Sequence, residues 1–563
     1  MAREIGITAL LIGLLMIPSG ALPADRDYAR SMVITRQGIV ATSQTLASQA
    51  GAQVLARGGS AVDAAIAANA VLSVIEPMSC GIGGDLFVLY RDGKTGKLTG
   101  LNASGWAPKG LTIQMLKSKG IAAMPKTGVY TITVPGCVDG WEKLHKRFGK
   151  LPWSELFLPA IHYATHGFPV TEMIQRAWYG EIMKLTEDRY TRHMFLPGGA
   201  APKLGEIFQN PDLAKALGLF AKGGAAEFYR GSIAKALLRT SDLNGGVLSA
   251  TDLSEYQAEW VDPISTEYRG WKVYELPPNG QGIAALEMLN ILAAFDMSKY
   301  EPSSAGALHL KIEAQKLAYQ DLQRYIGDPR FTKIPLDGLL SMPYAAERAG
   351  KINPEKANCD VTPGNPPPTA GDTIYLSAVD RDGNVVSLIQ SIYSAFGSGL
   401  AVYDMGFHLH NRGALFTLDP AHPNALAPRK RPFHTIIPAY MEKANLHIGF
   451  GIMGGLNQAQ AHAQFVSNIA DYGMNIQAAL EAPRFTRREF EGCEVTIEGR
   501  IPAPAQRQLE EQGHILDTRA AYDDVVGGGQ AVLHDSSAKV NFGASSPRKD
   551  GAAVPEPDPY FQK

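Results

Sequence analysis

The sequence has few cysteines, no block of like charge and no internal repeats. Its four cysteines, Cys80, Cys137, Cys359 and Cys493, stand singly and form no CxxC pair, which argues against a structural zinc site or a redox motif. They could pair if the chain is exported, but we expect buried free thiols. Lysine and arginine (53) nearly balance aspartate and glutamate (55) without a basic cluster, so nucleic acid is not an expected partner.

The N-terminus resembles a secretory leader. A short charged start is followed by an apolar run from Ile7 to Pro18 and by the small residues 19–21. We therefore predict a signal peptide over residues 1–24 and a periplasmic or secreted protein, or a cytoplasmic one if the leader is not a signal. No later run is long enough to cross a bilayer, so no membrane span is expected in the mature chain.

Local patterns predict several elements in the first half of the chain. Ser60 and Asp63 form a capping-box pattern at the start of an alanine-rich helix. A glycine-rich turn followed by a buried strand is expected over residues 80–90, and the third spaced glycine of a dinucleotide fingerprint is missing there. Residues 140–345 are mostly helical by periodicity.

A loose, proline-rich segment over residues 353–371 is followed at once by β-structure, with strands predicted over 373–379 and 385–389. Such a segment is open to cleavage. If the peptide bond before Thr373 is cut, the threonine hydroxyl becomes a nucleophile. Its α-amino group, with a pKa of about 7.7–8.0, becomes the base. No separate histidine is then needed to activate the hydroxyl.

Several short motifs occur in the order found in one enzyme family. They are Gly58-Gly59-Ser60-Ala61-Val62-Asp63-Ala64-Ala65, Gly81-Ile82-Gly83-Gly84-Asp85, Val134-Pro135-Gly136 with Asp139-Gly140-Trp141, Gly327-Asp328-Pro329, Asp382-Gly383-Asn384, Phe396-Gly397-Ser398-Gly399, and Gly543-Ala544-Ser545 with Pro547-Arg548. Over residues 35–552 the chain resembles the gamma-glutamyltranspeptidase family. The resemblance implies an N-terminal-nucleophile hydrolase of the α+β class, folded as a four-layer αββα sandwich.

The family cuts its own precursor before a threonine that aligns with Thr373. The resemblance therefore implies scission between Asp372 and Thr373, into a large subunit of residues 25–372 and a small subunit of residues 373–563. Because strands from both pieces would share one sandwich, we expect an interlocked heterodimer, and a higher oligomer stays open. No cofactor and no metal are expected to be required.

The implied mechanism begins with attack of Thr373 on the carbonyl carbon of a small-molecule amide. Ser391 falls where the family keeps a second hydroxyl beside the nucleophile. Gly454 and Gly455 align with the glycines of the oxyanion hole, where backbone N–H groups can approach without a Cβ in the way. A water or an amine would then resolve the acyl-enzyme, giving hydrolysis or transfer.

The substrate-holding positions depart from the family pattern. Ser104 stands where γ-glutamyl-binding members have an arginine for the α-carboxylate, and Leu415 stands where they have an acidic residue for the α-ammonium. His434 and Thr435 replace two serines that help hold the carboxylate, and Tyr393 replaces an asparagine. A charge left unpaired in a closed site costs several kcal/mol, so efficient glutathione chemistry is not expected.

Arg412 adds a charged side chain near the positions where the family's charged substrate-binding residues are missing. With its neighbour Asn411, it lies where the family binds the substrate near its ammonium group. An arginine there favours an acyl group that carries a carboxylate and lacks the ammonium, such as an oxamate-like or dicarboxylic group. The alternative is that Arg412 turns outward or pairs with Asp419. The His408-x-His410 pair lacks a third ligand at suitable spacing, so a core or surface role is expected rather than a metal site.

The sequence alone is compatible with three functions. The family activity is glutathione hydrolysis and γ-glutamyl transfer. The second reading is an amidase or acylase for a non-glutamyl acidic acyl group. The third is an uncleaved, non-catalytic binding protein on the same scaffold, against which the presence of Thr373, Ser391, Gly454 and Gly455 argues.

Overall fold

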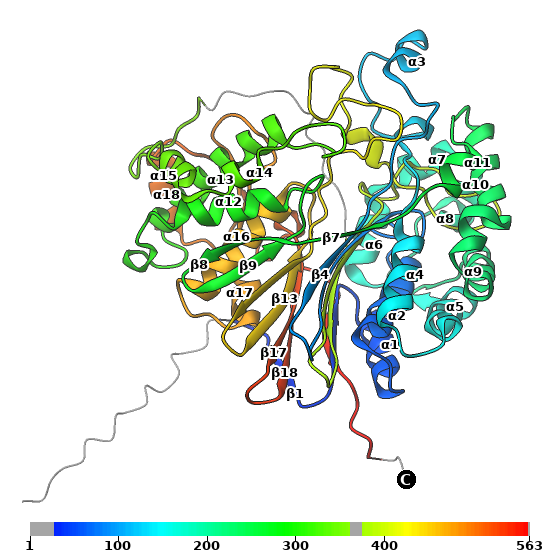
Figure 1. Cartoon of the computed structure of the whole chain (residues 1–563), viewed down its shortest axis with the longest axis horizontal. Coiled ribbons are helices and arrows are strands. Elements are labelled where there is room, and N and C mark those ends of the chain that lie inside the picture. The colour runs from blue at the N-terminus through cyan, green and yellow to red at the C-terminus, as the bar shows by residue number, and fades with distance from the viewer. Residues whose placement is uncertain (1–27, 361–373, 561–563) are drawn as a thin grey trace, which may run out of the picture.

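Two seven-stranded antiparallel sheets form the centre of the molecule (Figure 1). The computed structural model describes residues 28–360 and 374–560. In order across the first sheet lie β1 (Val33–Thr35), β18 (Val540–Ser545), β17 (Gly529–Asp535), β13 (Leu446–Ile452), β12 (Ala439–Lys443), β9 (Trp271–Glu275) and β8 (Ile264–Tyr268). In order across the second lie β19 (Ala552–Pro555), β2 (Ile39–Thr42), β10 (Ile374–Val379), β11 (Val385–Ser391), β3 (Asp85–Arg91), β4 (Leu98–Ala103) and β7 (Glu259–Val261).

The two sheets pack face to face through an apolar layer. Phe87, Tyr375 and Ile389 of the second sheet meet Tyr440 and Val532 of the first, and all five side chains are buried. Burial of a large apolar side chain contributes about 1.5–3 kcal/mol, so this layer is a principal source of cohesion between the sheets.

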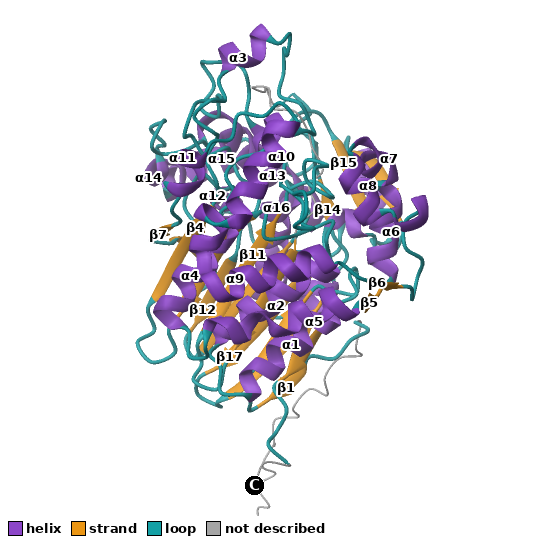
Figure 2. Ribbon diagram, turned by 90° about the vertical axis from the view of Figure 1, so that its right-hand side faces the viewer, coloured by secondary structure: helices purple, strands orange, loops and turns teal. Residues whose placement is uncertain are grey.

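Helices cover the outer face of each sheet, so the layers run helix, sheet, sheet, helix (Figure 1). Those on the first sheet's side are α12 (Gly282–Leu292), α13 (Ala305–Tyr325), α15 (Met342–Ala349), α16 (Asn457–Ala470) and α17 (Ile476–Glu481). Those on the second sheet's side, seen across its strands in Figure 2, are α1 (Thr45–Ala56), α2 (Ala61–Ile75), α4 (Cys137–Phe148), α5 (Leu158–His166) and α9 (Pro211–Arg230). The expected α+β class is confirmed.

The remaining elements lie around this sandwich. They are α3 (Ile113–Ser118), α6 (Glu172–Gly180), α7 (Ile182–Glu187), α8 (Arg189–Phe195), α10 (Ser232–Leu243), α11 (Ala250–Ser254), α14 (Leu336–Leu339), the pair β5 (Phe168–Pro169) and β6 (Ile207–Phe208), and a small sheet of β14 (Phe485–Thr486), β15 (Glu494–Glu498) and β16 (Ile515–Arg519) with α18 (Ala503–Glu511).

Helix α2 forms as the sequence predicts. The Ser60 hydroxyl accepts from the N–H of Asp63, and the Asp63 carboxylate accepts from the N–H of Ser60, which completes the capping box. Every residue of α2 is buried, and its many alanines let it pack closely on α1 and on the second sheet. The glycine-led strand is also confirmed as β3, and the hairpin is confirmed as β10 and β11.

Each sheet contains strands from both sides of position 373. In the second sheet β10 pairs with β2 on one edge and with β11 on the other, and β11 pairs with β3. In the first sheet β12 pairs with β9. The two halves of the sequence therefore share both sheets, which is the interlocked arrangement that the resemblance implied.

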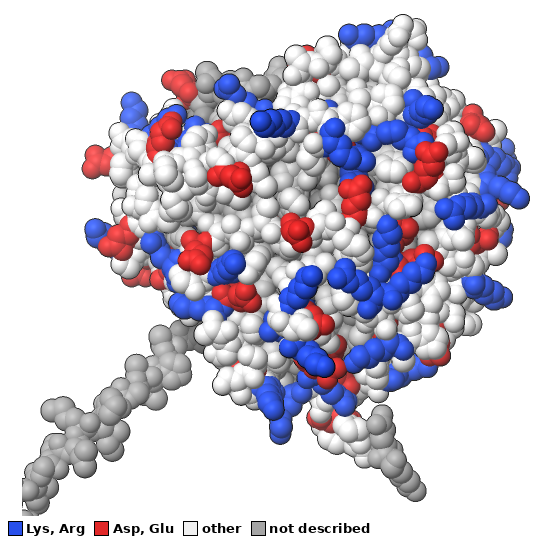
Figure 3. Space-filling view, in the orientation of Figure 1, with Lys and Arg blue, Asp and Glu red and all other residues white. Residues whose placement is uncertain are grey.

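The expectation of a mostly helical segment over 140–345 is incomplete. Strands β7, β8 and β9 lie in this range and extend the two central sheets. Within the described residues, no helix is both long and apolar enough to cross a bilayer. Acidic and basic side chains are interspersed over the face shown in Figure 3.

Candidate active site

The expected nucleophile Thr373 and the residue before it, Asp372, lie outside the described residues. Ile374, the first described residue after them, pairs with Gln390 of β11. The next residue on β11 is Ser391, which lies opposite Asp85 of β3. The candidate site therefore lies at this end of the second sheet.

Ser391 and Tyr393 form a sharp turn at the end of β11. The Ser391 hydroxyl accepts a hydrogen bond of 2.8 Å from the backbone N–H of Tyr393. Tyr393 has a φ of 76°, in the left-handed region that non-glycine residues rarely adopt. Such conformations concentrate at functional sites. The turn places the buried Tyr393 ring under the guanidinium of Arg412, whose central carbon lies 4.5 Å from the ring centroid.

Arg412 is fully buried, and most of its hydrogen-bonding capacity is unused. Its Nη1 donates to the Thr435 hydroxyl at 2.7 Å, and its Nε lies 3.7 Å from the Asp85 carboxylate. Nε and Nη2 have no hydrogen-bond partner among the described residues. Burial lowers the pKa of Arg412 to about 10, so the side chain is still charged at neutral pH. Both alternatives for Arg412 are wrong, since the side chain does not turn outward and its ion pair among the described residues is with Asp85 rather than Asp419.

Asp85 is the acidic centre of this cluster. One carboxylate oxygen accepts from His410 Nδ1 at 2.9 Å and from His434 Nε2 at 3.0 Å, and the other accepts from the N–H of Gly105 at 2.8 Å. Burial opposes ionisation of Asp85, but His410 and His434 hold the pKa of its carboxyl well below the usual range. Burial and the nearby Arg412 lower the pKa of His434 to about 3, so this ring is neutral near pH 7.

Gly454 and Gly455 form the turn between β13 and α16. Their φ values are 123° and 62°, both in the region that favours glycine, and a Cβ on Gly454 would meet the Asn457 side chain at 3.1 Å. In the described part of the chain, neither backbone N–H donates a hydrogen bond. Gln281 Nε2 donates to the carbonyls of both Gly455, at 2.8 Å, and Thr435, so one buried amide ties this turn to the Arg412 cluster.

Two predicted substrate contacts are instead engaged within the protein. The Ser104 hydroxyl donates to Asn102 Oδ1 at 2.7 Å. The Asn411 amide donates to the Lys126 carbonyl at 2.7 Å and accepts from the N–H of Ser394 at 3.0 Å. Both side chains hold loops around the site.

Leu415 contributes to an apolar wall beside Arg412. It packs in one buried cluster with Tyr393 and Ala414, and Phe433 lies against this cluster. A hydrocarbon side chain at this position offers no partner to an ammonium group.

Asp85, His410 and Gln281 are the members of the site that the sequence did not reveal as such. Asp85 closes the Gly81–Asp85 motif, which was a usable signal. His410 belongs to the His408-x-His410 pair, but the structure separates the two roles. His410 contacts Asp85, whereas His408 packs against Phe195, with ring centroids 4.2 Å apart.

A family model for gamma-glutamyltranspeptidase matches residues 47–556. The chain belongs to the gamma-glutamyltranspeptidase family. The glutathione hydrolase-like YwrD proenzyme of Bacillus subtilis is 38% identical over 532 residues, covering 93% of this chain and 99% of that protein. The oxamate amidohydrolase proenzyme of Klebsiella pneumoniae is 32% identical over 534 residues, covering 92% and 99%. The crystal structure of cephalosporin acylase from Bacillus halodurans matches with a TM-score of 0.88 at 40% identity, covering 96% and 99%.

The expectation that all four cysteines of this gamma-glutamyltranspeptidase family member are buried free thiols is wrong for two of them. Cys359 and Cys493 form a disulfide, while Cys80 and Cys137 are buried free thiols as expected. The pairing joins segments 134 residues apart, which local spacing could not reveal.

Away from the site, His309, Glu313 and His514 form a cluster of side chains of the types that bind metal ions. The donor atoms of His309, Glu313 and His514 lie within 4.8 Å of one another. His309 Nδ1 and His514 Nε2 are hydrogen-bonded at 2.8 Å, and the Lys316 ammonium contacts Glu313 at 2.6 Å. An ion would have to displace both interactions, so we assign the cluster to packing between α13 and the loop before β16.

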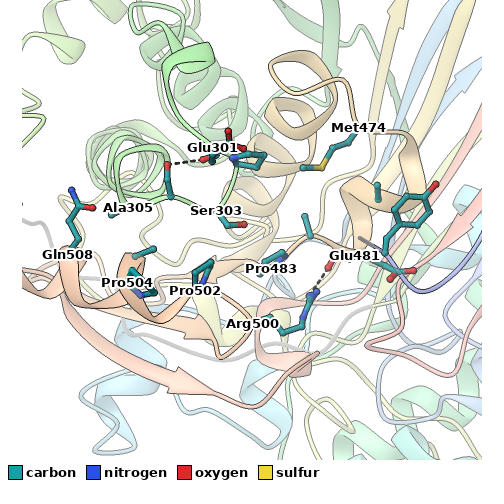
Figure 4. A pocket seen from close by; sticks show the side chains of 16 residues that line it. Glu301, Ser303, Ala305, Met474, Glu481, Pro483, Arg500, Pro502, Pro504 and Gln508 are labelled. Carbon is teal, nitrogen blue, oxygen red and sulfur yellow. Dashed lines mark hydrogen bonds between the residues drawn. The ribbon is translucent and has the colours of Figure 1, made fainter. Parts of the chain in front are cut away.

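A groove of about 470 Å³ lies elsewhere on the surface (Figure 4). Its walls come from the N-terminal end of α13, from α17 and from the Pro502–Gln508 region of α18, and Glu301 and Arg500 are among its polar residues. None of the candidate catalytic or substrate-binding residues that the structure describes lines it.

Proposed function

We propose that this chain is an autoprocessing N-terminal threonine amidohydrolase whose substrates are small amides with a carboxylate on the acyl group. The acyl group would carry no α-ammonium. The observation that carries the proposal is the buried, charged Arg412, two of whose donor nitrogens have no hydrogen-bond partner among the residues that the structure describes. A buried guanidinium with free donors favours a carboxylate, which accepts two parallel hydrogen bonds.

The reaction would begin after scission between Asp372 and Thr373. The Thr373 hydroxyl attacks the amide carbonyl carbon while its own amino group takes up the hydroxyl proton. The Gly454–Gly455 turn supplies N–H donors for the oxyanion, and this role is supported by the finding that neither N–H donates a hydrogen bond to a described residue. The amino group then returns a proton to the leaving amine. Water attacks the resulting ester, and the acyl acid is released.

The wall around Arg412 supports an acyl group without an ammonium. A γ-glutamyl group brings both a carboxylate and an ammonium into the site. Leu415 gives the ammonium no partner, and an unpaired buried charge costs several kcal/mol. Asp85 already accepts hydrogen bonds from two histidines and lies near Arg412, so its carboxylate is not available as a dedicated partner for a substrate ammonium.

The relatives' names accord with this substrate class. One is described as an oxamate amidohydrolase and another as a cephalosporin acylase, while YwrD is described as glutathione hydrolase-like. The family thus includes members with acyl groups other than γ-glutamyl.

A panel of three anilides whose acyl groups share a five-carbon chain tests the proposal. Glutaryl-p-nitroanilide carries the carboxylate alone, γ-glutamyl-p-nitroanilide adds the ammonium, and valeryl-p-nitroanilide has neither charge. We expect kcat/KM for the glutaryl compound to exceed both others by about 100-fold, which corresponds to about 2.7 kcal/mol. Oxamate is tested in parallel as a shorter acid amide. A preference for the γ-glutamyl compound would overturn the assignment.

A further inference from the structure

We propose that the disulfide between Cys359 and Cys493 joins the large and small subunits covalently in the mature enzyme. This inference rests on the proposed scission before Thr373, because the peptide bond between Asp372 and Thr373 lies between the two cysteines in the sequence. The two Cα atoms lie 4.9 Å apart. Without the disulfide, scission would leave two chains held by noncovalent contacts, which include ion pairs such as Lys150–Asp382.

Cys359 lies on the last described stretch before the expected break, and backbone contacts hold this stretch in place. The N–H of Ala357 donates to the Gln512 carbonyl at 2.7 Å, and the N–H of Asn358 donates to Glu313 at 3.2 Å. Gln512 belongs to the turn between α18 and β16. The Ala357–Gln512 hydrogen bond therefore holds the last described stretch of the large subunit against the small subunit independently of the sulfur bond.

Cys493 lies directly before β15 and is buried, with 2% of its surface exposed, whereas Cys359 is exposed. The Lys316 ammonium lies 3.5 Å from the Cys493 sulfur. A neighbouring ammonium stabilises the thiolate, which is the form that reacts. The pair thus combines one sulfur that an exchange partner can reach with one that is held next to a positive charge.

Formation requires an oxidised dithiol exchange partner, such as a protein disulfide oxidase. The Cys359 thiolate attacks the partner's disulfide, forms a mixed disulfide and releases one partner thiolate. The Cys493 thiolate then attacks the Cys359 sulfur and releases the second. The two thiols of this chain lose two electrons and two protons, and the partner's disulfide gains them as two thiols. Such partners act in oxidising compartments, which accords with the export that the N-terminal sequence predicts.

The bond has a mechanical consequence for the mature enzyme. It tethers the large subunit to the small subunit through Cys359, which lies 13 positions before Asp372, the expected last residue of the large subunit. Covalent linkage also makes reassociation of the two subunits intramolecular, which raises their effective concentration.

Denaturing gels of the full chain test the proposal. Free thiols are blocked with N-ethylmaleimide during denaturation, and the sample is run with and without dithiothreitol. We expect two bands with reductant and one band near the full-length position without it. Cys359→Ser and Cys493→Ser should each give two bands in both lanes, and the matched variants Cys80→Ser and Cys137→Ser should behave like the parent.

The gel separates failure of this proposal from failure of the proposed function. Two bands from the parent without reductant would overturn the covalent linkage and leave the scission intact. One band in both lanes would overturn the scission, and the linkage would fall with it. A thiol count on the unreduced, denatured protein provides an independent check. Two blocked thiols support the bond, and four contradict it.

Discussion

The guanidinium of Arg412 lies over the ring of Tyr393, with its central carbon 4.5 Å from the ring centroid. The same guanidinium donates to the Thr435 hydroxyl, and two of its nitrogens form no hydrogen bond with a described residue. An aromatic face stabilises a desolvated cation by about 2 kcal/mol. Tyr393 therefore helps to keep a charge buried where a substrate carboxylate would meet it.

Replacement of Arg412 should remove selectivity for the acidic acyl group. For Arg412→Met we expect kcat/KM on glutaryl-p-nitroanilide to fall by about 100-fold, or about 2.7 kcal/mol, because the carboxylate loses its charged partner. Activity on valeryl-p-nitroanilide should change by less than about 3-fold. Arg412→Lys keeps the charge but not the planar donors, so it should be intermediate. Equal losses on both substrates would show that Arg412 acts only through the fold.

Gln281 should position the oxyanion turn. In Gln281→Leu the carbonyls of Thr435 and Gly455 lose a shared donor, so the turn loses its tie to the Arg412 cluster. We expect kcat to fall by about 10- to 100-fold with little change in KM, since the donors act mainly in the transition state. Gln458→Leu is the matched control, because that buried glutamine accepts from the N–H of Ile437 instead. If the two variants lose kcat equally, the positioning role is wrong.

Asp85 should stabilise the fold by holding the charges around it. Asp85→Asn leaves Arg412 without a nearby buried carboxylate and turns an amide toward His410 and His434. Breaking a buried ion pair costs about 3–5 kcal/mol. The free energy of unfolding should be measured by urea denaturation in a Thr373→Ala background, so that a single uncut chain unfolds. The control Asp382→Asn alters an exposed carboxylate and should shift stability by less than about 0.5 kcal/mol. A comparably small shift for Asp85→Asn would contradict the role.

Stability should fall as the pH is lowered from 7 to 5. Burial lowers the pKa of His408, His434 and His462 to about 3 each. In the unfolded chain a histidine has a pKa of about 6.5, so below that pH the unfolded state binds protons that the folded state does not. The stability is fully present above about pH 6.5 and is lost toward pH 3, at up to about 1.4 kcal/mol per pH unit for each histidine.

Urea denaturation between pH 7 and 5, again in the Thr373→Ala background, measures how steeply the free energy of unfolding changes with pH. His408→Leu should make this dependence shallower, because neither ring nitrogen of His408 has a hydrogen-bond partner among the described residues. His166→Gln, at an exposed position, should leave it unchanged. Stability that rises on acidification would contradict the account.

The parts of the fold that could be predicted depend on local chemistry. The cap of α2 needs Ser60 and Asp63 three residues apart, and the β10–β11 hairpin needs the turn residues between its strands. Strands β8 and β9 were missed. Most of β8 is only partly buried at the sheet edge, so it lacks a clear hydrophobic alternation.

Single positions of the candidate site could be named from the sequence, but the combinations of distant residues around them could not. Arg412 and Thr435 were named from the sequence, but their hydrogen bond spans 23 positions. Asp85 meets His410 and His434 across more than 300 positions, and Gln281 reaches Gly455 across 174. Only the packing of strands from both halves of the chain brings these groups together.

The most direct test of the account is the intact mass of the purified, reduced protein. We expect two species, the smaller of which begins at Thr373 and ends at the C-terminus, and Thr373→Ala should give one uncut chain without amidase activity. A parent protein that hydrolyses the glutaryl anilide while no fragment begins at Thr373 would contradict the central claim.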